Sequence, residues 1–166
     1  LDIANVESKT GFAINLEDNI VSNIGSDKTY LEDADLVFSK LNSHMGYVFL
    51  TEEYKNKQYP LIGSTEFWGL NIKKDVIEPK LLKYLLLHKE FLHVAQFLRT
   101  GKSQSHPRIQ RDDFLNLEVP IISNDVAENL LENIIAIEKE IIHKKNKVMA
   151  LQDIIDNVLQ EYGVKT

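Results

Sequence analysis

The last fifth of the chain carries a seven-residue hydrophobic repeat that constrains the fold more than any other feature. Ten positions follow one another in steps of four and three residues, and one of them is polar: Leu130, Ile134, Ile137, Ile141, Lys144, Val148, Leu151, Ile155, Val158 and Tyr162. Neither glycine nor proline occurs between Pro120 and Gly163. At about 1.5 Å per residue, the predicted helix is roughly 55 Å long. The repeat is typical of a coiled coil, so we expect a second helix along this face.

The polar member of the repeat, Lys144, lies close to the midpoint of the predicted helix. A cation at such a position lowers the stability of a coiled coil but can fix its register or orientation. In an antiparallel pair of such helices the two Lys144 side chains would approach each other at the crossing region, where Glu138 and Glu140 are a turn or two away and would partly neutralise them. The alternative is an amphipathic helix that packs on its own domain, which a repeat of this length disfavours.

The residues before the long helix predict a domain of the α+β class, because strand-like runs come first and helical spacing comes later. We therefore divide the chain into a globular domain at 1–122 and a long helix at 123–166, with Ser123, Asn124 and Asp125 at its cap. The expected elements are short strands in 1–21, a hairpin with strands at 36–40 and 47–51 and Gly46 in its turn, strands at 61–64, 66–72 and 117–122, and helix over 79–98 with a break near Lys89.

The net charge of −6 argues against nucleic acid as a partner, but the charge is unevenly distributed. Residues 36–124 hold nine acids and twelve lysine or arginine residues, whereas residues 1–35 hold eight acids and two lysines. The stretch from Arg99 to Arg111 contains four of these cations and no acid. We therefore expect a local basic patch on an acidic protein.

The composition narrows the setting in which the chain works. It contains no cysteine, which excludes disulfides and thiolate metal sites and favours a reducing, cytoplasmic location. No apolar run approaches 18 residues, so we expect no contact with a membrane. With 43% hydrophobic residues and no low-complexity run, the chain is expected to fold around a core.

Three motifs follow one another in the globular part. They are Asp35-Leu36-Val37-Phe38-Ser39-Lys40-Leu41, then Gly63-Ser64-Thr65-Glu66-Phe67, then a run from Lys83-Tyr84-Leu85-Leu86 through Thr100-Gly101-Lys102-Ser103 to Leu117-Glu118-Val119-Pro120. In this order, and followed by a long helix, they resemble the target-recognition domain of type I restriction-modification specificity subunits. The resemblance covers essentially all of residues 1–162. One departure is Ile121-Ile122-Ser123-Asn124, where the family commonly has a proline-rich, glutamine-containing stretch.

The resemblance implies a mixed-sheet domain that selects a DNA sequence without doing chemistry itself. The implied partners are double-stranded DNA, modification methyltransferase subunits and, through them, the restriction subunit. Specificity subunits of this family carry two recognition domains and two long helices, whereas this chain has one of each. We therefore expect its long helix to pair with a second copy in a homodimer or with a second recognition domain. A C-terminal recognition domain of a fused adenine-N6 methyltransferase and a coiled-coil protein-interaction scaffold remain as alternatives.

The polar loop at 100–108 is the first candidate for DNA contact. Its lysine and arginine would neutralise phosphates, its other polar side chains would reach base edges, and Gly101 would permit close approach. The candidate residues are Lys102, Ser103, Gln104, Ser105, His106 and Arg108. The competing interpretation is an ordinary solvated loop. Composition alone favours that interpretation, whereas the family resemblance favours DNA contact.

The tip of the predicted hairpin is the second candidate for DNA contact. It combines a cation, amide and hydroxyl groups and an aromatic ring at one turn: Lys40, Asn42, Ser43, His44 and Tyr47. A turn built only from good turn formers is the competing interpretation.

Patterns that would indicate catalysis are weak. Asp35 with Glu53-Tyr54-Lys55 formally matches the acid, Glu-x-Lys arrangement of metal-dependent nucleases, but so short a pattern arises by chance in a chain with 27% charged residues. His88 and His93 are five residues apart, which does not align them for zinc on a helix. We therefore expect no catalytic residue, no bound metal and no cofactor.

Overall fold

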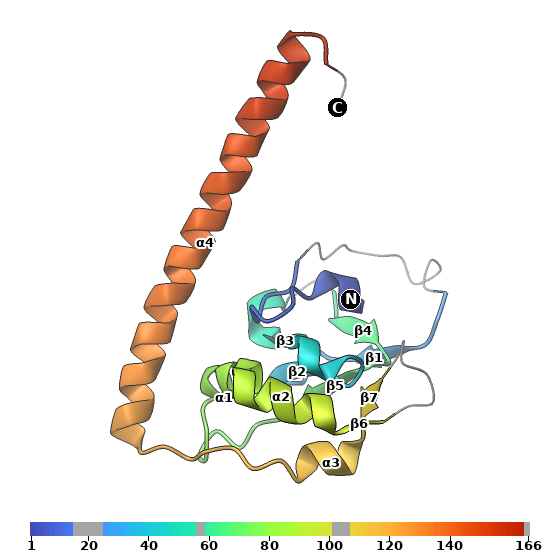
Figure 1. Cartoon of the computed structure of the whole chain (residues 1–166), viewed down its shortest axis with the longest axis vertical. Helices are drawn as coiled ribbons and strands as arrows, with labels where there is room; N and C mark the ends of the chain where they lie inside the picture. The colour runs from blue at the N-terminus through green and yellow to red at the C-terminus, as the bar shows by residue number, and fades with distance from the viewer. Residues whose placement is uncertain (15–24, 56–58, 101–106, 165–166) are drawn as a thin grey trace. The chain divides into compact units, whose positions relative to one another are not determined.

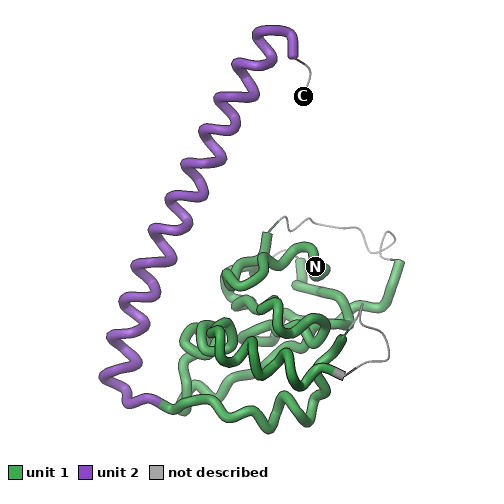
Figure 2. Tube along the Cα trace, viewed as in Figure 1, with its two compact units in different colours: residues 1–121 green, residues 122–166 purple. Residues whose placement is uncertain are grey.

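The computed structural model describes residues 1–14, 25–55, 59–100 and 107–164. The chain forms two compact units, residues 1–121 and residues 122–166 (Figure 2). The first unit holds small sheets and short helices, and the second holds one long helix (Figure 1). The predicted α+β class, with a long C-terminal helix, is confirmed.

The centre of the first unit is a three-stranded antiparallel sheet. Strand β2 (Leu36–Ser39) lies between β3 (Val48–Leu50) and β5 (Phe67–Leu70). Leu36 pairs with Leu50 on one side and with Leu70 on the other. Successive side chains of a strand point to opposite faces, and every residue of β2 is buried, so both faces of the sheet are covered.

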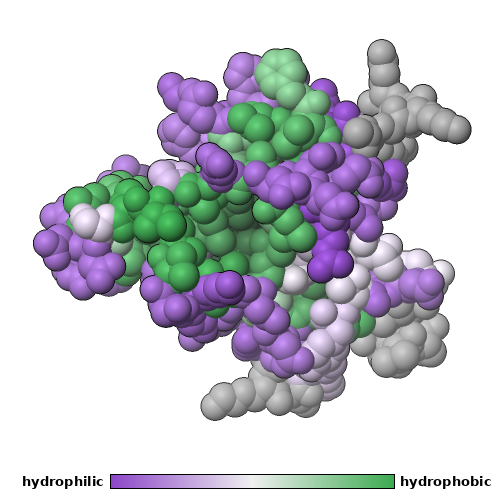
Figure 3. Space-filling model, turned by 90° about the horizontal axis from the view of Figure 1, so that it is seen from below, coloured by the Kyte–Doolittle hydropathy of each residue, from purple (hydrophilic) through white to green (hydrophobic). Residues whose placement is uncertain are grey.

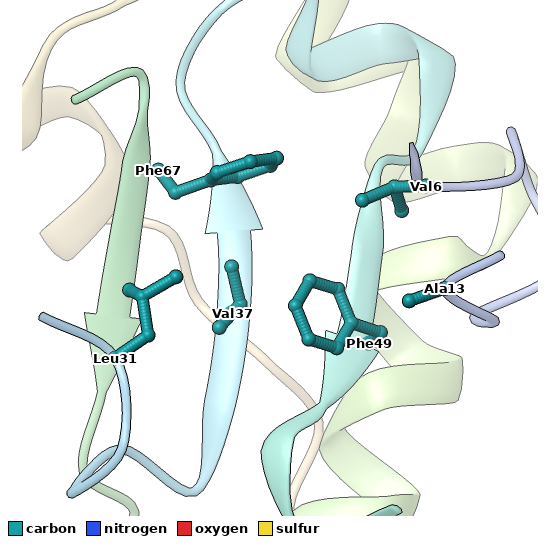
Figure 4. Close-up of a cluster of buried hydrophobic side chains, with 6 residues drawn as sticks. All are labelled: Val6, Ala13, Leu31, Val37, Phe49 and Phe67. Carbon is teal, nitrogen blue, oxygen red and sulfur yellow. The ribbon is translucent and has the colours of Figure 1, made fainter. Parts of the chain in front are cut away.

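Two clusters of buried side chains cover the two faces. The first joins the sheet to the N-terminal segment and is drawn in Figure 4: Val6, Ala13, Leu31, Val37, Phe49 and Phe67. The second joins the sheet to the helices: Leu36, Phe38, Val48, Leu50, Leu86 and Ile109. Side chains of a strand point alternately to its two faces, so Val37 lies in the first cluster whereas Leu36 and Phe38 lie in the second.

Two helices cover the second cluster, α1 (Pro79–Leu87) and α2 (Lys89–Phe97). The Glu78 side chain accepts a hydrogen bond from the backbone N–H of Leu81, which caps α1 at its start. His88 ends α1 and begins α2, and its Nδ1 lies 3.4 Å from the backbone N of Glu90. The predicted break near Lys89 is therefore confirmed, and His88 serves as a helix cap.

Smaller elements surround the central sheet. Strand β1 (Lys28–Tyr30) pairs with β4 (Ile62–Ser64), and β6 (Arg99–Thr100) pairs with β7 (Arg108–Ile109), both antiparallel. A short helix, α3 (Arg111–Leu115), follows β7. Among the described residues, three 3₁₀ turns lie at Ile3–Asn5, Ser43–Met45 and Thr51–Tyr54.

Two strand predictions were wrong. In the described part of residues 1–21, which ends at residue 14, there is a 3₁₀ turn at Ile3–Asn5 and a single bridge between Val6 and Ala13 rather than paired strands. Residues 117–122 are not a strand either, although Leu117 packs against the second cluster. An apolar run becomes a strand only when another strand is placed to pair with it, and the sequence pattern carries no information about that partner.

The second unit is the helix α4 (Asn124–Glu161), which spans 38 residues. Ser123 occupies the N-cap position as expected, but its side chain makes no capping hydrogen bond. The helix ends where Gly163 takes a φ of +78°, and the N–H of Val164 reaches back to the carbonyl of Leu159. The predicted long helix is confirmed, although it ends at Glu161, before the expected limit of residue 166.

Candidate nucleic-acid interface

The base of the first candidate loop is a two-residue ladder. Arg99 pairs with Ile109 and Thr100 with Arg108, which brings the two ends of the loop together. The predicted contacts Lys102, Ser103, Gln104, Ser105 and His106 lie outside the described residues. Arg108, at the end of the loop, is therefore the member of this candidate set that the structure places.

Strand β7 also lies beside the segment that follows β2. This contact brings the base of the 100–108 loop next to the hairpin, so the two candidate DNA-binding surfaces are joined. Leu41 forms a β-bridge with Arg108, and the N–H of Ile109 donates to the carbonyl of Lys40 at 3.0 Å. The N–H of Asn42 donates to the carbonyl of Pro107 at 2.9 Å. Lys40, Asn42 and Arg108, chosen from two separate stretches of sequence, are thus neighbours in one place.

Arg108 forms an ion pair with Glu66, a residue that the sequence analysis did not propose as functional. Its Nε lies 2.9 Å from Glu66 Oε2 and its Nη2 lies 2.6 Å from Glu66 Oε1, a bidentate ion pair. Hydrogen bonding to Glu66 raises the pKa of Arg108. Glu66 occurs in one of the family-like motifs, yet nothing in a separation of 42 residues links it to Arg108.

The hairpin itself is as predicted, but its tip packs against the protein. Asn42 and Gly46 both take positive φ, +50° and +66°, and bracket the 3₁₀ turn at Ser43–Met45. This turn contacts α2, and a Cβ at Gly46 would meet the Leu87 side chain at 3.1 Å. A side chain at Gly46 would strain the positive φ and would force the Leu87 side chain, at the end of α1, to shift by a few tenths of an ångström.

Packing of the hairpin tip against the protein buries one candidate DNA-contacting side chain and lowers the exposure of another. Ser43 is fully buried, so its side chain cannot contact DNA in this conformation, and its inclusion among the DNA contacts was wrong. Its Oγ has no hydrogen-bond partner among the described residues. Tyr47 is half-buried, with its ring packed against the first core cluster. Lys40, Asn42 and His44 remain partly accessible.

His44 lies in a positively charged environment. Its Nε2 is 3.5 Å from Nη1 of Arg99, whose Nε donates to the carbonyl of Gln96. Partial burial, then the charges of Arg99 and Lys9, lower the pKa of His44. In the sequence, Arg99 is notable only as one cation of the basic stretch. Its contact with His44 adds Arg99 to the candidate interface. Described cations from three parts of the chain thus gather here: Lys9, Lys40, and the pair Arg99 and Arg108.

The acids of the nuclease-like pattern are held by lysines from outside that pattern. Asp35 Oδ2 accepts from the backbone N–H of Ile72 at 2.9 Å, and Oδ1 pairs with Lys74 at 2.9 Å. These two contacts, in that order, lower the pKa of Asp35. Glu53 Oε1 lies 3.5 Å from Nζ of Lys80 and 3.7 Å from Nζ of Lys83. Across the described ranges, no group of three acid or histidine side chains has the spacing of a metal site.

The heptad face of α4, meaning the ten positions of the seven-residue repeat, is largely exposed in this chain. The exposed apolar members are Leu130 (40%), Ile137 (58%), Ile141 (37%), Val148 (65%), Leu151 (51%), Ile155 (50%), Val158 (46%) and Tyr162 (83%). Lys144 pairs with Glu140 at 2.8 Å on the same helix. No described helix is long and apolar enough to cross a membrane.

Apolar side chains also reach the surface at the end of the first unit. Leu115 on α3 is 62% exposed, and Ile121, in the segment after α3, is 75% exposed. On the first unit, Figure 3 shows apolar surface bordered by polar side chains. Exposed apolar surface with a polar rim is typical of sites that contact another molecule.

No family model and no curated protein sequence matches the chain. A solved structure does: the HsdS subunit from Thermoanaerobacter tengcongensis, with a TM-score of 0.65 and 15% sequence identity. The match covers 96% of this chain and 40% of the HsdS subunit. At this identity the likeness shows the fold, which is therefore HsdS-like along nearly the whole chain.

Proposed function

We propose that this chain recognises a DNA sequence as the specificity subunit, or half of one, in a type I restriction-modification system. The observation that carries the proposal is the HsdS-like fold over 96% of the chain. It agrees with the sequence motifs, which suggested a specificity subunit independently of any structure. The chain spans 40% of the length of that HsdS subunit, so the proposal includes a second half supplied by another copy or by more chain.

In this proposal residues 1–122 are the recognition domain and the surface around Lys40, Asn42, Arg99 and Arg108 faces DNA. The 100–108 loop, with Lys102 to His106, would enter a groove beside these residues. The cations neutralise phosphates, whereas amide and guanidinium groups read base edges. The chain would act without a catalytic residue or cofactor of its own. Methyl transfer would belong to a partner methyltransferase subunit, and cleavage to the restriction subunit that it recruits.

The long helix α4 would be the arm that sets the distance between two recognition domains. Its exposed heptad face suits a second helix of the same kind, because knobs-into-holes packing needs an apolar stripe on both partners. Two recognition domains on a rigid pair of helices would read a split target with a fixed spacer, since half-site separation follows protein geometry.

The test measures DNA binding by the full chain together with its methyltransferase subunits. A duplex selected from a random pool serves as the target, and a scrambled duplex as the competitor. We expect Lys102→Ala with Arg108→Ala to weaken target binding and to lower the dependence of log Kd on log salt by about one unit for each phosphate that is no longer neutralised. Binding that the double variant leaves unchanged would exclude the 100–108 assignment.

The matched control removes two exposed lysines away from the candidate interface, Lys73→Ala with Lys89→Ala. Lys73 follows β5 at the Asp35 end of the central sheet, and Lys89 begins α2, whereas Arg99 follows the end of that helix. This control should bind the target as the wild type does. If no duplex is preferred over the scrambled competitor, the DNA proposal itself is refuted.

A coiled-coil interaction scaffold is the second candidate, because the exposed heptad face of α4 suits protein binding without any DNA. The two candidates differ in the readout of the same titration. A scaffold shows no binding that differs between duplex sequences, whereas a specificity subunit must discriminate between them. A Mg²⁺-dependent cleavage abolished by Glu53→Ala would instead favour the nuclease pattern.

A further inference from the structure

The ion pair between Glu66 and Arg108 is built from two parts of the backbone that are each fixed in place. Arg108 lies in β7, where it pairs with Thr100 and bridges to Leu41. Glu66 lies in the turn between β4 and β5, and its carbonyl accepts from the N–H of Lys40 at 3.0 Å. Both partners therefore meet at the segment after β2, where the two candidate DNA surfaces join.

The geometry of the pair constrains the guanidinium group as well as its charge. Glu66 engages Nε at 2.9 Å and Nη2 at 2.6 Å, which is one edge of the planar fork. Holding one edge fixes the plane and the direction of the opposite edge, which carries Nη1 and the second Nη2 hydrogen. That opposite edge can also form two parallel hydrogen bonds with a planar acceptor pair.

The exposure of the two side chains fits a pair that serves a ligand. Arg108 is 43% exposed and Glu66 is 20% exposed, so the cation faces solvent more than the carboxylate does. A carboxylate at a DNA-binding surface repels phosphate, which weakens binding to any sequence. Its presence there is explained if the carboxylate improves recognition of one sequence over others.

We propose that Glu66 is a positioning residue that orients Arg108 to read a guanine in the major groove. Guanine presents O6 and N7 as two acceptors side by side, the pattern that the arginine fork matches. This inference rests on the proposed DNA-recognition function and adds to it the base that one position of the target contains. It also gives the acid of the Gly63-Ser64-Thr65-Glu66-Phe67 motif a role that the sequence did not suggest.

The experiment uses the full chain with its methyltransferase subunits and compares Glu66→Gln with the wild type. Glutamine keeps the size of the side chain but removes the charge and one of the two acceptor oxygens. The probes are the selected target duplex, the same duplex with each G·C pair replaced in turn, and a scrambled duplex. Thermal unfolding of the free chain is measured in parallel.

We expect Glu66→Gln to reduce the preference for guanine at one position, by at most the roughly 5- to 150-fold that loss of the whole bidentate hydrogen-bond pair to a base would cost. Binding to the scrambled duplex should stay equal or become tighter, because a negative charge has been removed. Arg108→Lys should lose the preference at the same position while keeping a cation for phosphate. A role confined to stapling β7 would instead lower the unfolding temperature and weaken binding to all duplexes together.

The possible failures are distinguishable. If the wild type prefers no duplex, both the proposed function and this inference are overturned. If Arg108→Lys loses guanine preference but Glu66→Gln keeps it, the DNA-recognition function stands and the positioning role of Glu66 is refuted. A charge-swapped chain, Glu66→Arg with Arg108→Glu, keeps an ion pair between the two segments and should still lose target binding. Wild-type target binding by that chain would show that the pair is only structural.

Discussion

Lys144 offers a quantitative test of the arm, because it is the polar member of an otherwise apolar heptad face. Its side chain is 70% exposed and pairs with Glu140, whose side chain is 64% exposed. An ion pair this exposed adds little to stability, so its removal has little effect. Replacing Lys144 with leucine should therefore reveal how much a continuous apolar stripe contributes to pairing.

The magnitude follows from the burial of two leucines, one from each chain of a homodimer. Burying a leucine side chain stabilises by about 1.5–3 kcal/mol, so the dimer gains at most about 3–6 kcal/mol. Even the lower end of this range corresponds to a dimer Kd that is roughly 100-fold smaller. Reduced register specificity is the expected accompanying cost, because polar residues at heptad positions restrict the pairing mode.

Sedimentation equilibrium over a range of concentrations measures this directly for the wild type, Lys144→Leu and Lys139→Leu. Lys139 is also exposed but lies on the opposite side of the helix from the heptad face, five residues from Lys144 at about 100° each. We expect the Lys139 variant to match the wild type. Equal dimerisation by all three chains, or an equal gain in both variants, would refute pairing through the heptad face.

Two further predictions concern the first unit. Asp35→Asn should lower the free energy of unfolding at pH 7, and the difference from wild type should shrink as the pH falls below 3.8, the ordinary pKa of an aspartate. The native contacts with Ile72 and Lys74 lower the pKa of Asp35, so the folded state binds this proton less readily and the stabilisation disappears on acidification. Urea titrations at several pH values measure the difference in the free energy of unfolding between the two chains. A difference that does not change with pH would contradict this prediction. Ser43→Ala should raise the free energy of unfolding by about 1 kcal/mol, because it removes a buried hydroxyl that has no partner among the described residues. A clear decrease of stability in thermal unfolding would show that the hydroxyl is satisfied in solution.

Exposure of the candidate interface could not be judged from residue types. Ser43 belongs to a turn of good turn formers, which usually face solvent, yet the tip rests on α2 and buries it completely. The charge of Arg99 is evident from the sequence, but its contact with His44 depends on how α2 leads into β6. Both outcomes reflect packing between segments that are distant in sequence, which local patterns do not encode.

Several elements carry a local signal that the amino-acid sequence is enough to predict. The heptad repeat predicted α4, and the strand period and turn residues predicted the β2–β3 hairpin. Proline followed by helical spacing predicted helix over 79–98 with a break near Lys89. These succeed because hydrophobic periodicity and capping act over a few residues. The family resemblance, read from motif order, pointed to the same fold that the HsdS structure shows.

Packing of the folded chain determines which of these elements meet. It left residues 117–122 without a partner strand, and it joined β7 to the segment after β2. It also placed Glu66 against Arg108 across 42 residues of chain. Long-range pairing depends on how separate elements pack together, so an ion pair of this kind appears only once the fold has formed.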